Sequence, residues 1–141
     1  MIAWDEVTER LSTARNYWLA TVDPLQRPHA MPVWGVFVDD DLFLETSAVT
    51  LKARNLATNP AVAVHLEDGD RVVAIEGRAE PIAPDRPLGE RLAAAFSTKY
   101  EGHRPSADQW QEGDLYRVVP RVVFAWHDMP SATRWRFIHE A

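Results

Sequence analysis

The sequence lacks cysteine entirely and is short of basic residues. No cysteine occurs among its 141 residues, so disulfides, thiolate metal ligands and cysteine nucleophiles are excluded. The 15 lysines and arginines are outnumbered by 21 acidic residues, which gives a formal net charge of −6. Because a nucleic-acid surface must offset phosphate repulsion with clustered bases, this balance predicts no nucleic-acid partner.

Long apolar runs are absent as well. No stretch approaches the roughly 20 apolar residues that a helix needs to cross a bilayer. The N-terminal segment MIAWDEVTER carries acids where a secretory signal has a basic and then an apolar stretch. Together these features predict no membrane association and a cytoplasmic protein.

Motifs of well-known enzyme classes are also missing. The sequence has no G-x-S-x-G elbow, no H-E-x-x-H pair and no P-loop. Its scattered histidines are His29, His65, His103, His127 and His139. None has a partner at the spacing of helical metal ligands, so we predict no metal site and assign no catalytic acid or base.

The elements that the sequence does contain are short strands divided by turns. The length suits one domain, and a hydrophobic fraction of 46% allows a real core. Helical spacing of apolar residues predicts helices over 3–14 and 85–100. A short helix over 50–58 is predicted by Thr50 as its N-cap and Asn59-Pro60 as its stop. Strands are predicted over 17–22, 29–38, 42–46, 61–67, 71–81, 114–119 and 121–126, with a loop at 101–113 and a candidate edge strand at 131–137. This pattern predicts a mainly β fold, a closed or half-closed antiparallel barrel with helices over its ends.

One segment, residues 45–55, combines hydroxyl groups and bases at the start of a predicted helix. Helix N-termini present unpaired N–H groups and a partial positive charge, which suits an anion. Lys52 lies in the first turn, where the helix dipole favours an acid, and Ser47, Thr50 and Arg54 add further donors. The alternative is a capped surface helix with solvated bases, which composition alone favours.

A second segment, residues 27–36, has a proline inside a predicted strand. Pro32 has no N–H to give to a sheet, so it indicates an edge or a place where a ligand meets the backbone. Gly35 allows close approach, and Met31 and Trp34 could pack on a planar ligand. An irregular barrel strand that packs on a second subunit explains the same residues.

Three stretches of the chain resemble a known family. They are RPHAMPVWGVFVDDDLFLETS, TLKARNLATNPAVAVHLE and the ending RVVFAWHD…SATRWRF. Together they are similar to the pyridoxamine 5'-phosphate oxidase-like, FMN-binding split barrels, and more narrowly to the flavin/deazaflavin (F420)-dependent oxidoreductases of actinobacteria. The resemblance spans roughly residues 10–137.

The resemblance implies one split-barrel domain over 1–141, with a helix at 3–14, the barrel at 17–127 and a tail at 128–141. It also implies a homodimer with cofactor sites at the interface. The cofactor phosphate would be held by Thr46, Ser47, Thr50, Lys52 and Arg54. The ring would lie along Met31, Pro32, Val33 and Trp34, and the partner subunit would contribute Trp126, Trp135 and Arg136.

The function implied is a flavin-type oxidoreductase that passes hydride to or from a small organic substrate, with F420 favoured over FMN. A non-catalytic carrier or sensor of flavin, F420 or haem is an alternative from another class. A structural dimer with a decayed site is another. A true pyridoxamine 5'-phosphate oxidase is a further alternative, but its substrate-binding positions and C-terminal motif are not evident in this sequence.

Overall fold

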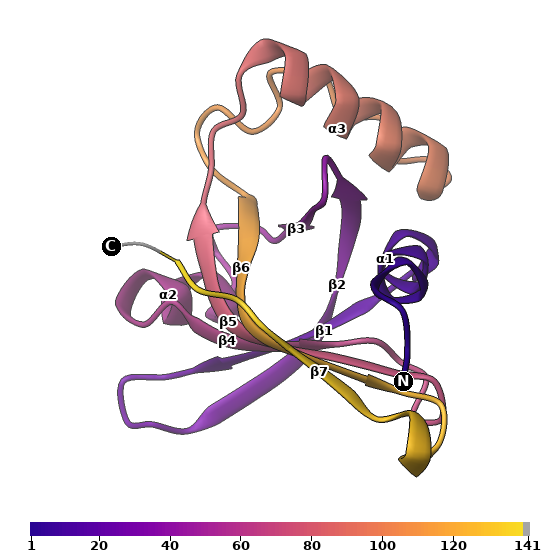
Figure 1. The fold of residues 1–141 in the computed structure, drawn as a ribbon. Coiled ribbons are helices and arrows are strands. Elements are labelled where there is room, and N and C mark those ends of the chain that lie inside the picture. Colours follow the sequence, from indigo (N-terminus) through magenta and orange to yellow (C-terminus); the bar gives the residue numbers. More distant parts are fainter. Residues whose placement is uncertain (140–141) are drawn as a thin grey trace.

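The structure, a computed structural model, describes residues 1–139, so the last two residues of the predicted tail lie outside it. The described residues form seven strands, three α-helices and one short 3-10 turn (Figure 1). The helices are α1 (Trp4–Thr13), α2 (Leu51–Thr58) and α3 (Arg86–Lys99), and the 3-10 turn is η1 (Met129–Ser131). The strands are β1 (Tyr17–Val22), β2 (Pro28–Val38), β3 (Asp41–Glu45), β4 (Ala61–His65), β5 (Val72–Pro81), β6 (Leu115–Trp126) and β7 (Thr133–Arg136). None of the helices in residues 1–139 is long and apolar enough to span a membrane.

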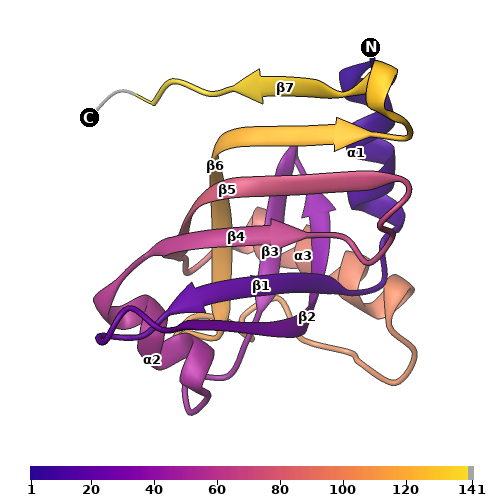
Figure 2. The same ribbon diagram turned by 90° about the horizontal axis from the view of Figure 1, so that it is seen from below.

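Six strands close into an antiparallel barrel, as the sequence predicts. The strand order is β3-β2-β1-β4-β5-β6, and pairing of β3 with β6 completes the ring (Figure 2). Strand β7 pairs with the second half of β6 at the edge of the sheet, where an edge strand is predicted. The hydrophobic core fills the barrel because residues of alternate parity point inward, as in β1, where Tyr17, Leu19 and Thr21 are buried.

Two strands change partner along their length. The first half of β2 pairs with β1, up to Val33, and its second half pairs with β3, from Trp34 onward. In the same way β6 pairs with β3 near its start and with β7 near its end. Each of these strands therefore belongs to two parts of the sheet, and the gap that opens at the change of partner positions the site described below.

The prediction of two separate strands around Pro120 is wrong. Residues 115–126 form one strand, β6, and Pro120 lies opposite Gly77 where the register shifts between Glu76 and Gly77. The missing N–H of proline is tolerated there because the ladder is already irregular. Gly77 is needed at this point, since a Cβ on it would lie 2.2 Å from the carbonyl oxygen of Val119.

The acidic turn between β2 and β3 forms a tight hairpin. Asp39 and Asp40 both have positive φ, 54° and 62°, which is the conformation of a type I′ turn. Aspartate tolerates this conformation better than most residues. The turn sets the register of β2 against β3.

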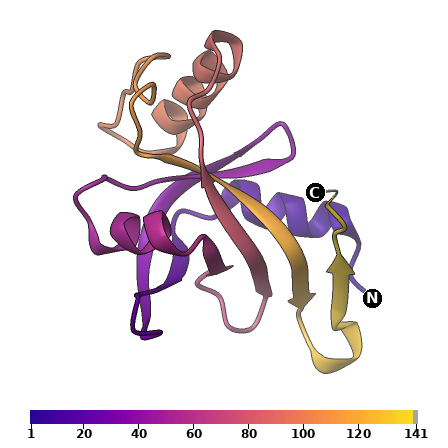
Figure 3. The same ribbon diagram turned by 90° about the vertical axis from the view of Figure 1, so that its left-hand side faces the viewer.

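Helix α3 and the loop after it build a second, smaller core against β2 and β3. Its buried members are Val36, Phe43, Leu92, Phe96, Tyr100, Trp110 and Leu115. Figure 3 shows α3 at one end of the molecule, with α2 on one flank and β7 beside α1 on the other. The helix thus covers the part of β2 that follows Trp34 and leaves the part before it open.

Candidate functional site

A cleft lies where β2 changes partner. It has a volume of about 360 Å³ and is bounded by β2, the end of β3 and the loop that enters α2. Its lining residues are Asn16, Pro32, Val33, Trp34, Glu45, Thr46, Ser47, Thr50 and Lys52. Seven residues that sequence reasoning assigned to the phosphate and the ring are therefore brought together in one place.

The start of α2 presents N–H donors that suit an anion. Thr50 is the N-cap, as predicted: its Oγ1 accepts from the Ala53 amide at 3.3 Å and donates to the Ser47 carbonyl at 2.7 Å. The amides of Leu51 and Lys52 have no acceptor within residues 1–139, and the first turn holds no acid. The positive end of the helix dipole therefore faces the cleft without compensation from the chain.

Lys52 supplies a charge at this point. Its side chain is half-buried, and it joins none of the ion pairs of residues 1–139. The hydroxyl of the buried Thr46 lies 3.3 Å from that of Thr50, and Ser47 is exposed. Because the Thr50 proton is already given to a carbonyl, the Thr46 hydroxyl is the donor to Thr50, and the Ser47 hydroxyl is the one left to donate to a ligand.

Asp114 holds the loop before α2 through two hydrogen bonds, and the sequence analysis did not identify this residue. Its carboxylate accepts from the Ala48 amide at 2.9 Å, and its carbonyl accepts from the Thr46 amide at 3.0 Å. Asp114 precedes β6 and is 66 residues from Ala48 in the chain, so no local pattern could have revealed the contact. Its positive φ of 73° was likewise invisible in the sequence.

Trp34 forms the opposite wall of the cleft. Its indole stacks on the Tyr100 ring at 4.3 Å between centroids and 11° between planes, and 36% of the residue stays exposed. The Tyr100 hydroxyl accepts from the Gly35 amide at 2.9 Å and donates to the Arg15 carbonyl at 2.6 Å. The indole is therefore held on one side and open on the other, which suits stacking with a planar ligand.

Glu45 is the acid of the cleft. Its Oε2 accepts from Trp110 Nε1 at 2.7 Å, and its Oε1 lies 2.8 Å from His103 Nε2, without the geometry of a hydrogen bond. Both partners come from the loop at 101–113, to which the sequence assigned no role. The carboxylate therefore has a fixed position, and Glu45 lies opposite Trp34 in the ladder of β2 and β3.

The remaining predicted residues lie elsewhere in the chain. Arg54 and Met31 are exposed and do not line the cleft. Trp135 is opposite buried Val123 and packs edge-on against Trp4 at 5.2 Å. Trp126 and Arg136 also lie away from the cleft of their own chain. Their assignment, with Trp135, to a partner subunit's site stays a prediction.

Residues 3–127 match the family described as pyridoxamine 5'-phosphate oxidase. The chain belongs to this family. The match covers the whole barrel, including β2, the loop before α2 and β6, and it confirms the resemblance found in the sequence. No curated protein matches the chain.

Solved structures with this fold have varied descriptions. A conserved hypothetical protein of Mycobacterium tuberculosis is 29% identical, with a TM-score of 0.74 over 89% of this chain and 85% of that one. A structure described as an F420 reductase is 27% identical, with a TM-score of 0.61 over 79% of this chain and 90% of that one. A haem storage protein of Vibrio cholerae is 24% identical, with a TM-score of 0.67 over 85% and 91%, and shows the fold alone.

A half-buried lysine lies next to the stacked rings of Trp34 and Tyr100. Lys99, at the end of α3, donates to the Tyr17 hydroxyl at 2.7 Å and to the Gly35 carbonyl at 3.0 Å. Burial lowers the pKa of Lys99 to about 8, and burial also raises the pKa of Tyr17 and of Tyr100. The amine thus ties α3 to β1 and β2 directly beneath Trp34.

The lowered pKa of Lys99 predicts a pH-dependent stability. Below pH 8 the amine is charged in both the folded and the unfolded protein, so the folded state bears the full free-energy cost of burying the charge. Between pH 8 and 10.5 the unfolded chain binds more protons, so the wild type gains stability there relative to Lys99→Met. We expect the free energy of unfolding of the wild type, relative to that of Lys99→Met, to rise by about 2 kcal/mol from pH 7 to pH 10. This is less than the full pKa difference implies, because part of the ammonium group stays hydrated in the folded protein. Urea titrations at both pH values measure this, and an unchanged difference between the two proteins contradicts it.

Proposed function

We propose that the protein is an oxidoreductase that uses a flavin-type cofactor and acts on a small organic substrate in the cytoplasm. The cofactor phosphate is held at the start of α2, and the ring lies along β2. The observation that carries this proposal is the unpaired Lys52 beside the free amides and hydroxyls of one helix start, in a cleft that leads to Trp34. F420 is favoured and FMN comes next.

The donors present fit a phosphate. A phosphate ester needs positive charge and several N–H or O–H donors, which Lys52, the Leu51 and Lys52 amides and Ser47 provide. Both candidate cofactors carry phosphate, so this set serves either one. The preference for F420 is supported by the likeness to an F420 reductase at 27% identity.

The charges of the cleft also orient the cofactor. Lys52 marks one end and Glu45 the other, so a negative group is attracted to α2 and repelled from the Trp34 side. When bound, the cofactor supplies the hydride chemistry, and the protein's part is binding, orientation and electrostatics. Trp34 and Pro32 offer a flat apolar surface on which a ring can lie. Hydride transfer by the cofactor needs no dedicated acid or base from the chain, and the sequence analysis assigned none.

A second subunit is expected to close the cleft. The outward side of β1, β2 and β4 carries small or flat apolar groups: Trp18 lies opposite Pro32 and His65, and Ala20 lies opposite Ala30 and Ala63. The Trp18 and His65 rings stack at 6.3 Å. Such a flat face is typical of an interface between copies of a chain. Because Pro32 belongs both to this face and to the cleft, a partner docked here would border the cofactor.

A carrier without turnover is the second candidate. It is supported by the shared fold of a haem storage protein. Pyridoxamine 5'-phosphate oxidation is a third candidate, supported by the family match. The following experiments separate these possibilities.

The proposed phosphate site at the start of α2 is tested by replacing Lys52. Lys52→Ala should weaken binding of FMN and of F420 by about 1.5–3 kcal/mol, or roughly ten- to a hundredfold, which is the worth of a charged hydrogen bond. Calorimetric titration of the apoprotein measures this. Riboflavin, which has the ring but no phosphate, should bind wild type and variant alike.

The matched control is Arg86→Ala, which removes the same charge from the exposed start of α3. It should leave all three affinities unchanged. Equal affinity of Lys52→Ala and wild type for FMN and F420, or an equal loss for riboflavin, would show that the phosphate lies elsewhere.

Turnover distinguishes an enzyme from a carrier. The absorption spectrum of the purified protein should show a flavin or deazaflavin band rather than a Soret band. The loaded protein, reduced and mixed with a panel of enones, quinones, linear tetrapyrroles and pyridoxamine 5'-phosphate, should be reoxidised by a member of the panel faster than free cofactor is. A Soret band, or reoxidation no faster than that of free cofactor, favours the carrier.

The homodimer is tested on the flat face. The wild type should have a dimer mass at micromolar concentration by light scattering. Ala63→Arg places a charge in the centre of the exposed face and should give a monomer that binds FMN and F420 more weakly. Ala94→Arg, on an exposed position of α3, should stay dimeric. A monomeric wild type contradicts the interface model.

A further inference from the structure

A second cavity lies on the other side of β2, inside the barrel end. It has a volume of about 220 Å³ and shares no lining residue with the cleft. Its lining residues are Trp4, Leu11, Phe37, Asp40, Asp41, Leu42, Ile75, Val118, Pro120, Val123, Phe137 and His139. Nine of these twelve are apolar, so the cavity continues the barrel core rather than the surface.

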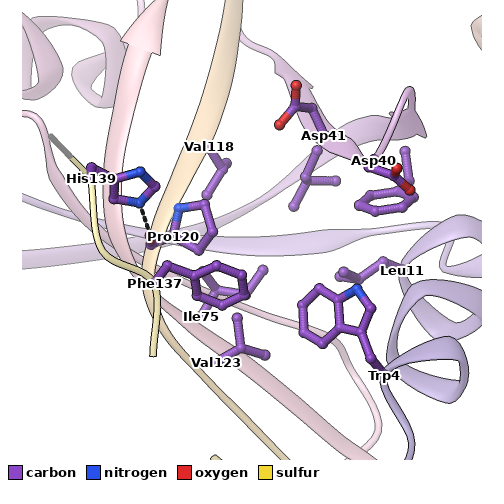
Figure 4. Close-up of a pocket in the computed structure, with 12 residues that line it drawn as sticks. Trp4, Leu11, Asp40, Asp41, Ile75, Val118, Pro120, Val123, Phe137 and His139 are labelled. Carbon is purple, nitrogen blue, oxygen red and sulfur yellow. Dashed lines mark hydrogen bonds between the residues drawn. The ribbon is translucent and has the colours of Figure 1, made fainter. Parts of the chain in front are cut away.

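The cavity exists because aromatic groups cover the end of the barrel without filling it. Trp4 of α1 and Phe137 after β7 meet at 5.5 Å between ring centroids, and Ile75 and Val123 lie close to these rings (Figure 4). Close-packed protein interiors leave few voids larger than a water molecule. A void of this size, lined by rings and aliphatic groups, is therefore room for a ligand.

The rim of the cavity is acidic. Asp40 and Asp41 lie above the rings of Trp4 and Phe137 in Figure 4. Asp41 reaches Arg117 only at 4.0 Å, and Arg117 is already bound to Glu80. Burial raises the pKa of the Asp41 carboxyl, Arg117 opposes part of this rise, and the neighbouring acids add to it.

Two polar groups of the cavity have no partner in the part of the chain that the structure describes. Asp40 joins none of the ion pairs of residues 1–139, whereas its neighbour Asp39 is paired with Arg91. The Trp4 indole N–H donates to no acceptor within the same range. His139 is engaged, because its Nε2 lies 2.5 Å from the Pro120 carbonyl oxygen. The rim thus carries two carboxylates, of which Asp41 has a distant cation in Arg117 and Asp40 joins no ion pair of residues 1–139.

We propose that this cavity is a second ligand site, for a small molecule with an apolar ring system and one ammonium group. An engineered apolar cavity of about 150 Å³ binds benzene, so the larger void here suits two fused rings. The rings enter among Trp4, Phe137 and Ile75, and the ammonium group lies at Asp40 and Asp41. The acidic rim also disfavours the anionic cofactor, which separates the two sites by charge.

The test uses three probes that share one ring system. Tryptamine carries a positive charge, 3-ethylindole none and indole-3-acetate a negative one. Calorimetry with the wild-type protein should show saturable binding of tryptamine at least tenfold tighter than that of indole-3-acetate, with 3-ethylindole between them. No saturable binding, or equal affinity for all three probes, overturns the proposal.

Substitutions in the cavity show where the three probes bind. Asp40→Asn keeps a residue that tolerates the positive φ of the turn, and it should weaken tryptamine at least threefold while leaving 3-ethylindole unchanged. Asp70→Asn removes the same charge from another exposed turn and should change nothing. Ile75→Phe fills the cavity and should abolish binding of all probes, and if it fails to fold, the Asp40→Asn result decides. Lys52→Ala should leave tryptamine binding intact, and a loss there would place the probe in the cleft and overturn the proposal.

Discussion

The exchange of hydrogen-bond partners in β2, between Val33 and Trp34, is the constraint on which the rest of the structure depends. A strand that leaves β1 for β3 must bend, and the two neighbours then diverge. The opening is filled on one side by the start of α2 and on the other by α3 and its loop. Because the side chains of β2 alternate, the same strand faces the cleft with Pro32 and Trp34 and the inner cavity with Phe37.

The site combines local and distant supports. The cap by Thr50 and the position of Lys52 follow from a few adjacent residues. The shape of the loop depends on Asp114, and the position of the cleft acid depends on Trp110. A mobile loop would lose conformational freedom when a ligand binds, and the interaction with the ligand would have to offset that free-energy cost. The distant contacts order this loop in advance, so in the proposed function more of the interaction with a phosphate would be available for affinity.

The parts that could be predicted from the sequence are those that local physics determines. The boundaries of β1 and the Thr50 cap follow from local sequence and capping rules, and the pattern of short strands indicates a closed or half-closed barrel. The family resemblance implied a ring site on β2 next to a phosphate site at the start of α2. The roles of Asp114 and His103 could not be predicted, because each depends on contacts across more than fifty residues. Pro120 misled the prediction for β6, since the register shift that accommodates it belongs to Gly77 on another strand. The inner cavity is a packing property, and no residue pattern encodes it.

The edges of the sheet have a consequence for how copies of the chain meet. Barrel closure leaves two unpaired stretches in the described chain: the first half of β2 on its side away from β1, and the outer side of β7. The first contains Pro28 and Pro32, and the second is only four residues long and carries Arg134 and Arg136. Prolines, short length and charge are the features by which natural sheets discourage the addition of a foreign strand. Growth of the sheet into a fibre by strand addition is thereby opposed at both ends.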